Sequence, residues 1–385
     1  MSETSLALYV HMPWCVRKCP YCDFNSHQLK SAQPDGSYID ALLKDFDLEA
    51  PRLEGRRIDT VFFGGGTPSL FKPEEFARLL TALKGRIAFA ADAEITMEAN
   101  PGTIERGRFS GYAEAGINRV SLGAQSFDAR ALKVLGRIHS AEDTHRAVEE
   151  LRAAKLDNFN LDLMYALPGQ TLEEALYDVR TACSLGPSHI SYYQLTLEPG
   201  TVFHSRPPQL PDDDAAWQIQ TAGQALLAQA GYEQYEISAY AKQGVRCRHN
   251  LNYWLFGDYL GLGAGAHGKL SLGDPMQVLR TVKPKQPREY QDRIRHAQDH
   301  AADTARVAAA ELPFEFMLNA LRLVEGFPVH RFIERTGLSM TSIEPALQEA
   351  ERRKLITRDH QKIAPTPLGQ AFLNDLQALF LKDPQ

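Results

Sequence analysis

The chain has 385 residues, a length typical of two or three domains. Apolar residues make up 44% of it and charged residues 23%, as in soluble globular proteins, and the net charge of −6 excludes nucleic-acid binding through an overall basic surface. The five cysteines are an odd number, and the start MSETSLALYV has no basic flank before a long apolar segment. We therefore expect no signal peptide and a reducing, cytoplasmic location.

The first half of the chain alternates short apolar strands with amphipathic helices. The helical patterns YIDALLKDFDLEA, PEEFARLLTALKG and TLEEALYDVRTACSLG lie between strands, and the second begins with Pro and ends with Gly, as helices often do. This alternation predicts parallel strands with crossover helices, in a doubly wound sheet or an open barrel. The predicted strands are Leu6–Val10, Thr60–Phe63, Ile95–Glu98, Arg119–Gly123, Asn160–Met164 and Ile190–Leu195.

The pattern changes near residue 200. The stretch EPGTVFHSRPPQLPDDD is rich in proline and acid, which indicates a loop or a domain junction. Ala215–Tyr232 is the longest run without charge, but its four glutamines predict an amphipathic helix and not a membrane span. A mixed region follows to about residue 300.

The tail from Pro313 to Gln385 predicts three or four helices, with a hairpin in LITRDHQKIAPTPLG. This arrangement indicates a winged-helix-like module. DNA contact needs a basic face, but the tail has nine lysine and arginine residues against nine acidic ones, so we expect a structural lid or adaptor. We place domains at residues 1–200, 201–300 and 301–385.

Three of the five cysteines fall within the eight residues CVRKCPYC, just after the first predicted strand. A zinc site on Cys15, Cys19 and Cys22 needs a fourth ligand, for which His11 or His27 is available. A dithiol redox pair would leave Cys15 unused. Three thiolates can also hold a [4Fe–4S] cluster whose fourth iron is open to an amine and a carboxylate, such as those of S-adenosylmethionine. The spacing favours the cluster over these alternatives.

Two basic residues of the loop, Arg17 and Lys18, would place positive charge beside an anionic cluster. The whole segment YVHMPWCVRKCPYCDF resembles the cluster loop of radical S-adenosylmethionine enzymes. More narrowly, it resembles the branch that contains oxygen-independent coproporphyrinogen III dehydrogenase and the HemW haem chaperones. The segments FFGGGTPS, TMEANPGT, RVSLGAQSF, LGRIH, NLDLMYALPGQT, QLTLEPGT and PTPLGQAFLNDLQALF resemble that branch in the same order, so the resemblance covers nearly the whole chain.

The resemblance implies an α/β fold, a partial (β/α)6 barrel followed by a C-terminal helical, winged-helix-like domain. It also implies residue roles, with Cys15, Cys19 and Cys22 as cluster ligands. Positions that line the cluster-bound S-adenosylmethionine match Tyr9, Tyr21, Gly65 and Glu98. Positions of a second S-adenosylmethionine in the dehydrogenase match Gly66, Thr67, Gln125, Arg137, Asp162 and Thr196. These residues end predicted strands or follow them, where barrel enzymes build their sites.

The residue types suit these roles. The glycines of GGGTP would let the backbone approach a ligand and donate N–H groups to its carboxylate. Glu98 would face the ammonium group or the ribose hydroxyls. Asp162 lies within an apolar strand, and a lone buried carboxylate is costly, which favours a functional role.

One position departs from the dehydrogenase. That enzyme has a fourth cysteine two residues after the third, where this chain has Phe24. The departure favours the haem-chaperone branch.

The stretch HNLNYW, residues 249–254, resembles a pattern associated with the chaperone branch. His249 would be an axial haem ligand, with Tyr253 and Trp254 against the porphyrin. The alternative is that His249 caps a turn and the aromatic side chains fill the core. Cys247 and His267 are rival ligands.

Two motifs are set aside. GAGAHG, residues 263–268, matches a dinucleotide fingerprint, but KLSLGDP after it predicts a strand and turn where a helix is needed, so we expect a site of close backbone approach. CPYC is followed by Asp23, so it is not the C-x-x-C-H of covalent haem attachment.

The leading hypothesis is a haem chaperone that carries a [4Fe–4S] cluster and S-adenosylmethionine and passes haem to an acceptor. The alternatives are a coproporphyrinogen III dehydrogenase and a winged-helix regulator with a sensory cluster. We assign no catalytic residue, and we expect no nucleic-acid partner. The partners that the resemblance implies are haem, an acceptor such as a membrane-associated respiratory protein, an electron donor such as a flavodoxin, and a second copy in a homodimer.

Overall fold

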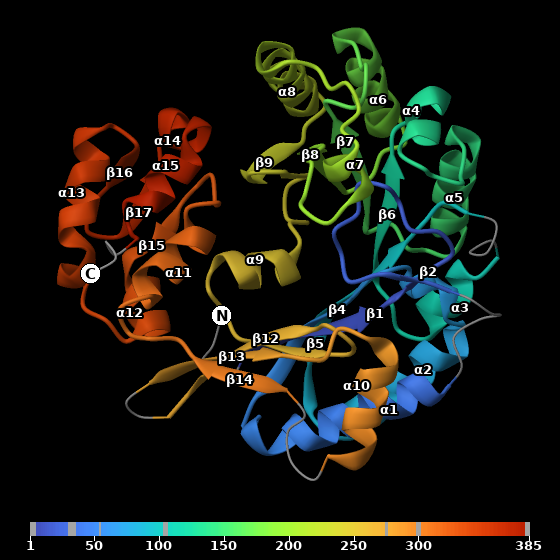
Figure 1. The fold of residues 1–385 in the computed structure, drawn as a ribbon, viewed down its shortest axis with the longest axis horizontal. Helices are drawn as coiled ribbons and strands as arrows, with labels where there is room; N and C mark the ends of the chain where they lie inside the picture. Colours follow the sequence, from blue (N-terminus) through green and yellow to red (C-terminus); the bar gives the residue numbers. More distant parts are fainter. Residues whose placement is uncertain are drawn as a thin grey trace.

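A computed structural model describes residues 5–29, 36–53, 55–102, 107–273, 276–297 and 302–381 (Figure 1). Six parallel strands form the centre of the fold, and they confirm all six predicted strands. Each lies next to its neighbour in chain order. They are β1 Ser5–Met12, β4 Arg57–Gly65, β5 Ala88–Ala99, β6 Arg119–Gln125, β7 Phe159–Tyr165 and β8 His189–Gln194.

The strand order decides between the two predicted architectures. A doubly wound sheet reverses its strand order at a switch point and carries helices on both faces. Here the order along the sheet follows the order along the chain, so right-handed crossovers carry the helices to one side, as in a barrel. The described strands do not close, because β14 and β9 form opposite edges, and the fold is a partial barrel.

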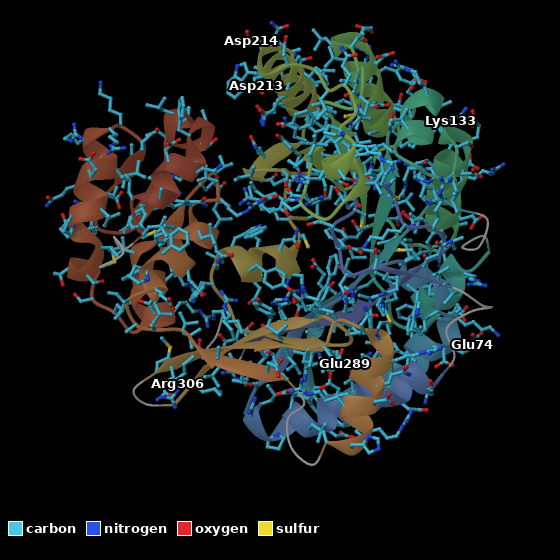
Figure 2. The ribbon with its side chains drawn as sticks, in the orientation of Figure 1. Glu74, Lys133, Asp213, Asp214, Glu289 and Arg306 are labelled. Carbon is cyan, nitrogen blue, oxygen red and sulfur yellow. The ribbon has the colours of Figure 1, made fainter. Side chains whose placement is uncertain are left out.

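Helices cover the outside of this partial barrel (Figure 1). The predicted helical segments at residues 38–50, 73–85, 171–186 and 215–232 are confirmed. The helices are α1 Ser37–Glu49, α2 Pro73–Lys84, α3 Phe109–Glu114, α4 Ala129–Val134, α5 Ala141–Ala153, α6 Leu172–Ser184 and α8 Asp213–Gln229, with 3-10 turns η1 Ala50–Arg52 and η2 Pro68–Leu70. Figure 2 shows charged side chains on the outer elements; those labelled are Glu74, Lys133, Asp213, Asp214, Glu289 and Arg306. None of the described helices is both long and apolar enough to span a membrane.

The region after residue 200 extends the sheet at both edges. On one side β11 Tyr259–Leu262 runs parallel to β1, and antiparallel strands continue from it. The other strands are β12 His267–Leu272, β13 Gln277–Val282 and β14 Asp303–Arg306 on that side, and β10 Ala239–Ala241 and β9 Glu233–Glu236 on the opposite side. Three further helices are α7 Val202–Ser205, α9 Arg248–Trp254 and α10 Pro287–His296.

The GAGAHG stretch leads into strand β12, so the rejection of a dinucleotide fingerprint is confirmed. Its backbone makes the close contacts expected of it. The Ala264 carbonyl accepts a hydrogen bond from Asn25 Nδ2 at 2.9 Å, and the Ala264 N–H donates to the Tyr38 hydroxyl at 2.9 Å.

The C-terminal part has its own apolar core, around Phe316, Phe327 and Phe332. Its hairpin is confirmed by the antiparallel pairing of β16 with β17. The helix number is higher than expected, because a break at Phe372 divides the last helix. The elements are α11 Leu312–Ala320, β15 Phe327–Pro328, α12 Val329–Thr336, η3 Met340–Ile343, α13 Glu344–Arg352, β16 Ile356–Arg358, β17 Lys362–Pro365, α14 Pro367–Ala371 and α15 Leu373–Ala378. The expected boundary at residues 300 and 301 lies outside the described residues.

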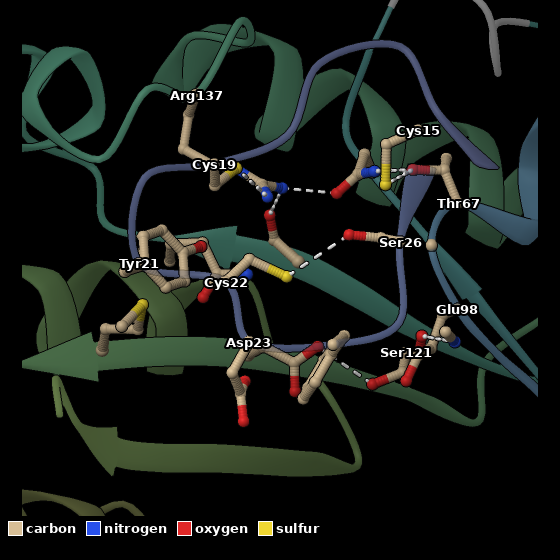
Figure 3. Close-up of a pocket in the computed structure, with 18 of the residues that line it drawn as sticks. Cys15, Cys19, Tyr21, Cys22, Asp23, Ser26, Thr67, Glu98, Ser121 and Arg137 are labelled. Atoms are coloured by element: carbon tan, nitrogen blue, oxygen red, sulfur yellow. Dashed lines mark hydrogen bonds between the residues drawn. The ribbon is translucent and has the colours of Figure 1, made fainter. Parts of the chain in front are cut away.

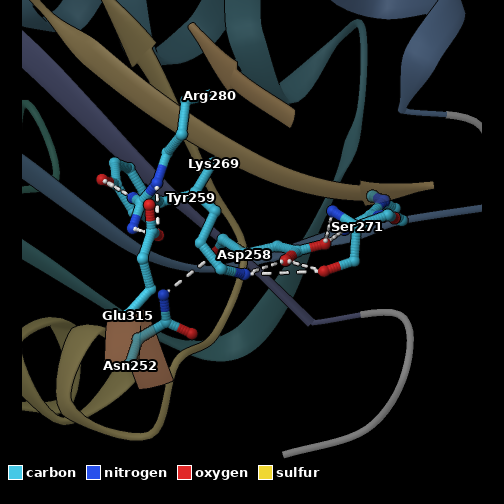
Figure 4. A network of polar contacts seen from close by, with 8 residues as sticks. Asn252, Asp258, Tyr259, Lys269, Ser271, Arg280 and Glu315 are labelled. Carbon is cyan, nitrogen blue, oxygen red and sulfur yellow. Dashed lines mark hydrogen bonds and ion pairs between the residues drawn. The ribbon is translucent and has the colours of Figure 1, made fainter. Parts of the chain in front are cut away.

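A buried polar cluster ties the chain before β11 to the extra strands (Figure 4). Asp258, 1% exposed, accepts hydrogen bonds from Lys269 Nζ at 2.8 Å, Arg56 Nη1 at 2.6 Å and the Ser271 N–H at 2.8 Å. Burial alone would raise the pKa of Asp258, but these donors outweigh it and lower the pKa to about 2. Burial lowers the pKa of Lys269 to about 8, which still leaves the ammonium charged at pH 7.

We expect Asp258→Asn to lower the free energy of unfolding by about 3–5 kcal/mol, because it leaves Lys269 buried beside a neutral amide. Stability should also depend on pH in the wild type. The depressed pKa of Asp258 stabilises the fold above its unfolded value near 4, and this contribution is lost as pH falls toward 2. Urea unfolding between pH 2 and pH 6 measures both effects. Asp92→Asn is the control, since the Asp92 side chain is 81% exposed and its pair with Arg248 is worth at most about 1 kcal/mol. Equal losses in the two variants would contradict the assignment.

Candidate cofactor site

A cavity of about 450 Å³ lies at the carboxyl ends of the parallel strands (Figure 3). Residues at or just after the ends of β4 to β8 line it on one side, and the cysteine loop after β1 lines it on the other. Because the strands are parallel, their carboxyl ends meet at the same edge of the sheet and bring together residues far apart in sequence. A volume of this size suits a cofactor or small-molecule ligand.

The three loop cysteines line this cavity as free, half-buried thiols. Each has a polar neighbour. Cys15 accepts from Thr67 Oγ1 at 3.6 Å, and Cys19 accepts from Arg137 Nη1 at 3.7 Å. Cys22 lies 3.8 Å from Ser26 Oγ. Burial raises the pKa of the Cys15 and Cys22 thiols, although these hydroxyl contacts oppose the shift.

The loop backbone is held by hydrogen bonds on both sides of the cysteines. Lys18 Nζ donates to the carbonyls of Phe24 and Ser26, each at 3.3 Å. These two hydrogen bonds hold the start of the loop against its end. The Phe203 N–H of α7 donates to the Pro20 carbonyl at 2.9 Å. The short strands β2 Trp14–Cys15 and β3 His27–Gln28 pair in parallel and hold the two ends of the loop together.

Three thiols on one loop match the donor set of a [4Fe–4S] centre, in which each thiolate binds a different iron. The other two cysteines are elsewhere: Cys183 lies on α6, and Cys247 is 1% exposed before α9.

The glycine-rich turn after β4 packs against the cysteine loop. Gly65 has φ +112°, and a Cβ there would lie 2.4 Å from the His11 ring. A Cβ at Gly66 would lie 2.5 Å from the Trp14 carbonyl oxygen. The N–H groups of Gly65, Gly66 and Thr67 donate to the Glu98 carboxylate and to the Met12 and Trp14 carbonyls. For one of them to bind a ligand carboxylate, as the sequence predicts, it would have to exchange this internal acceptor. The glycines serve close packing of the turn against the loop.

Two carboxylates reach the cavity from neighbouring parts of the barrel. Glu98 accepts the Gly65 N–H at 3.1 Å, and burial together with the charge of Asp162 raises its pKa to about 8. Asp162 accepts from Ser121 Oγ at 3.1 Å and Asn160 Nδ2 at 2.7 Å. Burial raises the pKa of Asp162, and these donors oppose the rise. The cavity therefore favours a cation or hydroxyl donors beside this pair.

A guanidinium faces the carboxylates across the cavity. Besides Cys19, Arg137 donates to the Gly123 carbonyl at 2.9 Å and to Asn100 Oδ1. Asn100 Nδ2 in turn donates to Thr67 Oγ1 at 3.1 Å, which connects β5, β6 and the cysteine loop. Gln125 ends β6 with φ +67°, a strained conformation for a residue other than glycine, and accepts the Tyr193 hydroxyl at 2.7 Å.

Nine of the ten residues predicted to bind S-adenosylmethionine line the cavity: Tyr21, Gly65, Gly66, Thr67, Glu98, Gln125, Arg137, Asp162 and Thr196. Tyr9 does not. Its hydroxyl lies 2.9 Å from His11 Nδ1, and its ring stacks on Phe62. Asn100, Ser121 and Tyr193 also line the cavity but were not predicted from the sequence. Asn100 follows Glu98 in TMEANPGT, and its position just after a strand could have identified it. No sequence feature distinguishes Ser121 and Tyr193 as site residues.

The His249 side chain lies inside the fold, at 1% exposure. Its Nδ1 is 2.8 Å from Thr60 Oγ1, its Nε2 is 3.1 Å from the Tyr253 hydroxyl, and its ring stacks on Phe62 at 5.1 Å. Burial, aided by Arg119, lowers its pKa to about 3, so the ring is neutral. Both nitrogens are therefore engaged, and haem ligation by His249 would need this arrangement to open.

The two rival haem ligands differ in access. The Cys247 thiol contacts Glu94 at 3.5 Å, and burial raises its pKa to about 12, against the opposing charge of Arg119. His267 is exposed at the start of β12.

Residues 9–182 match the Radical SAM superfamily, and residues 307–372 match the HemN C-terminal domain. The chain is 51% identical to the heme chaperone HemW of Escherichia coli (strain K12) over 98% of both proteins. It is 33% identical to the heme chaperone HemW of Bacillus subtilis (strain 168), over 97% of this chain and 98% of the relative.

Among solved structures, coproporphyrinogen III oxidase (HemN) from Escherichia coli, described as a radical SAM enzyme, has the same fold. Its TM-score is 0.82 over 98% of this chain and 90% of that chain. At 22% sequence identity, this likeness bears on the fold alone.

We expect Glu98→Gln to stabilise the protein freed of small ligands by about 1–2 kcal/mol at pH 8, because the amide avoids placing a charge beside Asp162. The raised pKa means that the fold favours protonated Glu98, so wild-type stability should fall as pH rises from about 4.5 to about 8. Thermal unfolding at pH 5 and pH 8 measures the difference, which should widen with pH. The exposed Glu74→Gln on α2 is the control. A destabilised Glu98→Gln at pH 8 would show that Glu98 is ionised and well paired.

Proposed function

The chain belongs to the HemW family of the radical S-adenosylmethionine superfamily, and on this basis we propose that it is a haem chaperone. It carries a [4Fe–4S] cluster and S-adenosylmethionine, and it passes haem to an acceptor protein. The observation that carries this proposal is the identity to proteins named heme chaperone HemW along the full length of both chains. The bacterial relatives align with 97–98% of this chain.

Cys15, Cys19 and Cys22 would hold the cluster, because their thiols all line one cavity and three thiolates suit a cluster with one open iron. The bound cluster supplies one-electron chemistry and an open iron for S-adenosylmethionine. Arg137, beside Cys19, compensates the negative charge of such a centre. Glu98 and Asp162 would take the ammonium group or the ribose hydroxyls of S-adenosylmethionine. The residues matched to a second molecule line the same cavity.

The runner-up is oxygen-independent decarboxylation of coproporphyrinogen III, which the motifs shared with that branch of the superfamily also allow. Phe24 speaks against it. This residue stands where the dehydrogenase has its fourth loop cysteine, and its side chain is 58% exposed at the cavity. A phenyl ring cannot replace a thiol in proton or hydrogen transfer. A cluster-sensing regulator is disfavoured by the equal numbers of basic and acidic residues in the tail.

The proposed function implies several partners. Haem is the cargo, and the acceptor is a haem-requiring protein, such as a membrane-associated respiratory protein. A one-electron donor such as a flavodoxin would reduce the cluster. We place the protein in the cytoplasm and expect a homodimer, which light scattering would test.

We expect Cys15→Ala, Cys19→Ala and Cys22→Ala each to abolish an oxygen-sensitive [4Fe–4S] cluster, because the three thiolates are its only protein ligands. Anaerobic reconstitution followed by measurement of iron, sulfide and visible absorbance checks this. Cys183→Ala is the matched control and should retain the cluster. Zinc in place of iron in the native protein, or a cluster that survives loss of two loop cysteines, would contradict the assignment.

We expect the anaerobically prepared protein to bind haem and to form no protoporphyrinogen from coproporphyrinogen III in a parallel assay. His249→Ala should weaken the haem absorption band, and loss of the three loop cysteines should leave the band in place. His296→Ala on exposed α10 is the control. An unchanged band in His249→Ala would move the search to Cys247 and His267. Steady protoporphyrinogen formation would reverse the order of the two functions.

A further inference from the structure

Three buried polar residues lie between the cavity and helix α9 and belong to neither. Asn160 on β7, His189 on β8 and Tyr235 on β9 are each 1% exposed. Buried polar groups are retained only where partners satisfy them, so their contacts report what they hold in place.

The first contacts lead from the cavity into the barrel. Asn160 Nδ2 donates to Asp162 Oδ1 at 2.7 Å and to Ser121 Oγ at 2.7 Å. Asn160 Oδ1 lies 2.7 Å from His189 Nδ1 and also accepts Ser191 Oγ at 3.2 Å.

The next contacts lead from His189 to the start of α9. His189 Nε2 is 2.8 Å from the Tyr235 hydroxyl, which accepts the Cys247 N–H at 3.4 Å. Cys247 is the residue before α9. The next two N–H groups, of Arg248 and His249, donate to the Glu94 carboxylate at 3.0 and 3.1 Å. Tyr235 and Glu94 together therefore fix the N-terminus of α9.

These bonds have one consistent direction. A carboxylate only accepts, so Asp162 draws the amide nitrogen of Asn160 and turns its oxygen toward His189. That oxygen requires a proton on His189 Nδ1. The neutral ring then has a lone pair on Nε2, which accepts the Tyr235 hydroxyl. Burial lowers the pKa of His189 well below its usual value, in keeping with a ring that has one N–H.

We propose that Asn160, His189 and Tyr235 are positioning residues that orient Asp162 for the ligand of the cavity and link that ligand to helix α9. This inference rests on the proposed function for the identity of the two ligands, S-adenosylmethionine in the cavity and haem at α9. A ligand that contacts Asp162 would change the hydrogen bond from Asn160 at one end of the series. Movement of α9 would change the hydrogen bond from the Cys247 N–H to Tyr235 at the other end. Such linkage is reciprocal: each ligand changes the affinity for the other by the same factor.

The test is a double-mutant cycle on S-adenosylmethionine affinity, measured by anaerobic calorimetry on the reconstituted protein. Tyr235→Phe removes the hydroxyl and leaves His189 Nε2 without its donor. We expect it to weaken binding about threefold to tenfold in the wild-type background. In the Asp162→Asn background the same change should alter affinity less than about twofold, because an amide no longer fixes the direction of the bonds.

Tyr232→Phe is the matched control. Tyr232 is also buried, precedes the same strand and donates its hydroxyl to the Pro187 carbonyl at 2.8 Å, outside the series of contacts. It should leave the affinity unchanged in both backgrounds. Equal weakening by Tyr235→Phe with and without the Asp162 carboxylate would overturn the proposal, because a general packing defect behaves that way.

A second measurement needs no variant. In protein labelled with ¹⁵N-histidine, the His189 resonances should show a proton on Nδ1, and S-adenosylmethionine should shift them. A proton on Nε2, or His189 chemical shifts that do not change when S-adenosylmethionine is added, would overturn the proposal. Neither measurement uses haem, so a protein that binds no haem would refute the proposed function and leave this coupling to be judged by its own results.

Discussion

The shared direction of the six central strands is the constraint on which the site depends. Parallel strands in chain order end at one edge, so the turn after β4, Glu98 on β5, Gln125 on β6 and the segment after β8 face one cavity. The cysteine loop closes over that edge because Gly65 and Gly66 let it approach the turn after β4. A doubly wound sheet would also gather the carboxyl ends of its strands at one edge, but its ligand crevice would lie where the strand order reverses. Here the order does not reverse, so consecutive strands β4 to β8 all contribute to one cavity.

The barrel interior contains several buried polar and charged residues. Glu94, Arg119, Asn160, His189 and His249 are all buried inside it, where isolated charges would be costly. Asn160 and His189 contact each other, and the Glu94 carboxylate accepts the N–H groups of Arg248 and His249 at the start of α9. Arg119 Nε, by contrast, has no hydrogen-bond partner among the described residues. A network of this kind fixes orientation at some expense of stability, which is the usual balance at functional sites. Its members come from strands β5 to β9 and from α9 itself, so the cavity and α9 share one interior.

Local patterns in the sequence were sufficient for the strands, the hairpin of the tail and the cysteine loop. Apolar runs identify β1 and β4 because strands of a parallel sheet are buried on both faces. Contacts across long sequence separations could not be read this way. Arg137 approaches Cys19 over 118 positions, and only the folded barrel reveals the pair. The acceptors of the GGGTP N–H groups could not be predicted either, because they are the Met12 and Trp14 carbonyls and the distant Glu98 carboxylate.

The closed state of His249 is compatible with carrying cargo. The His249 nitrogens already contact Thr60 and Tyr253, so a nitrogen would have to give up one of these contacts to bind iron. The net free energy gained would therefore be smaller than that of the iron–nitrogen bond alone. A storage protein would gain from an open, preformed ligand. A chaperone has to release haem, and internal partners that compete for the same imidazole favour release. The lowered pKa of His249 would add to this, because the ring is already neutral and would bind iron without first losing a proton.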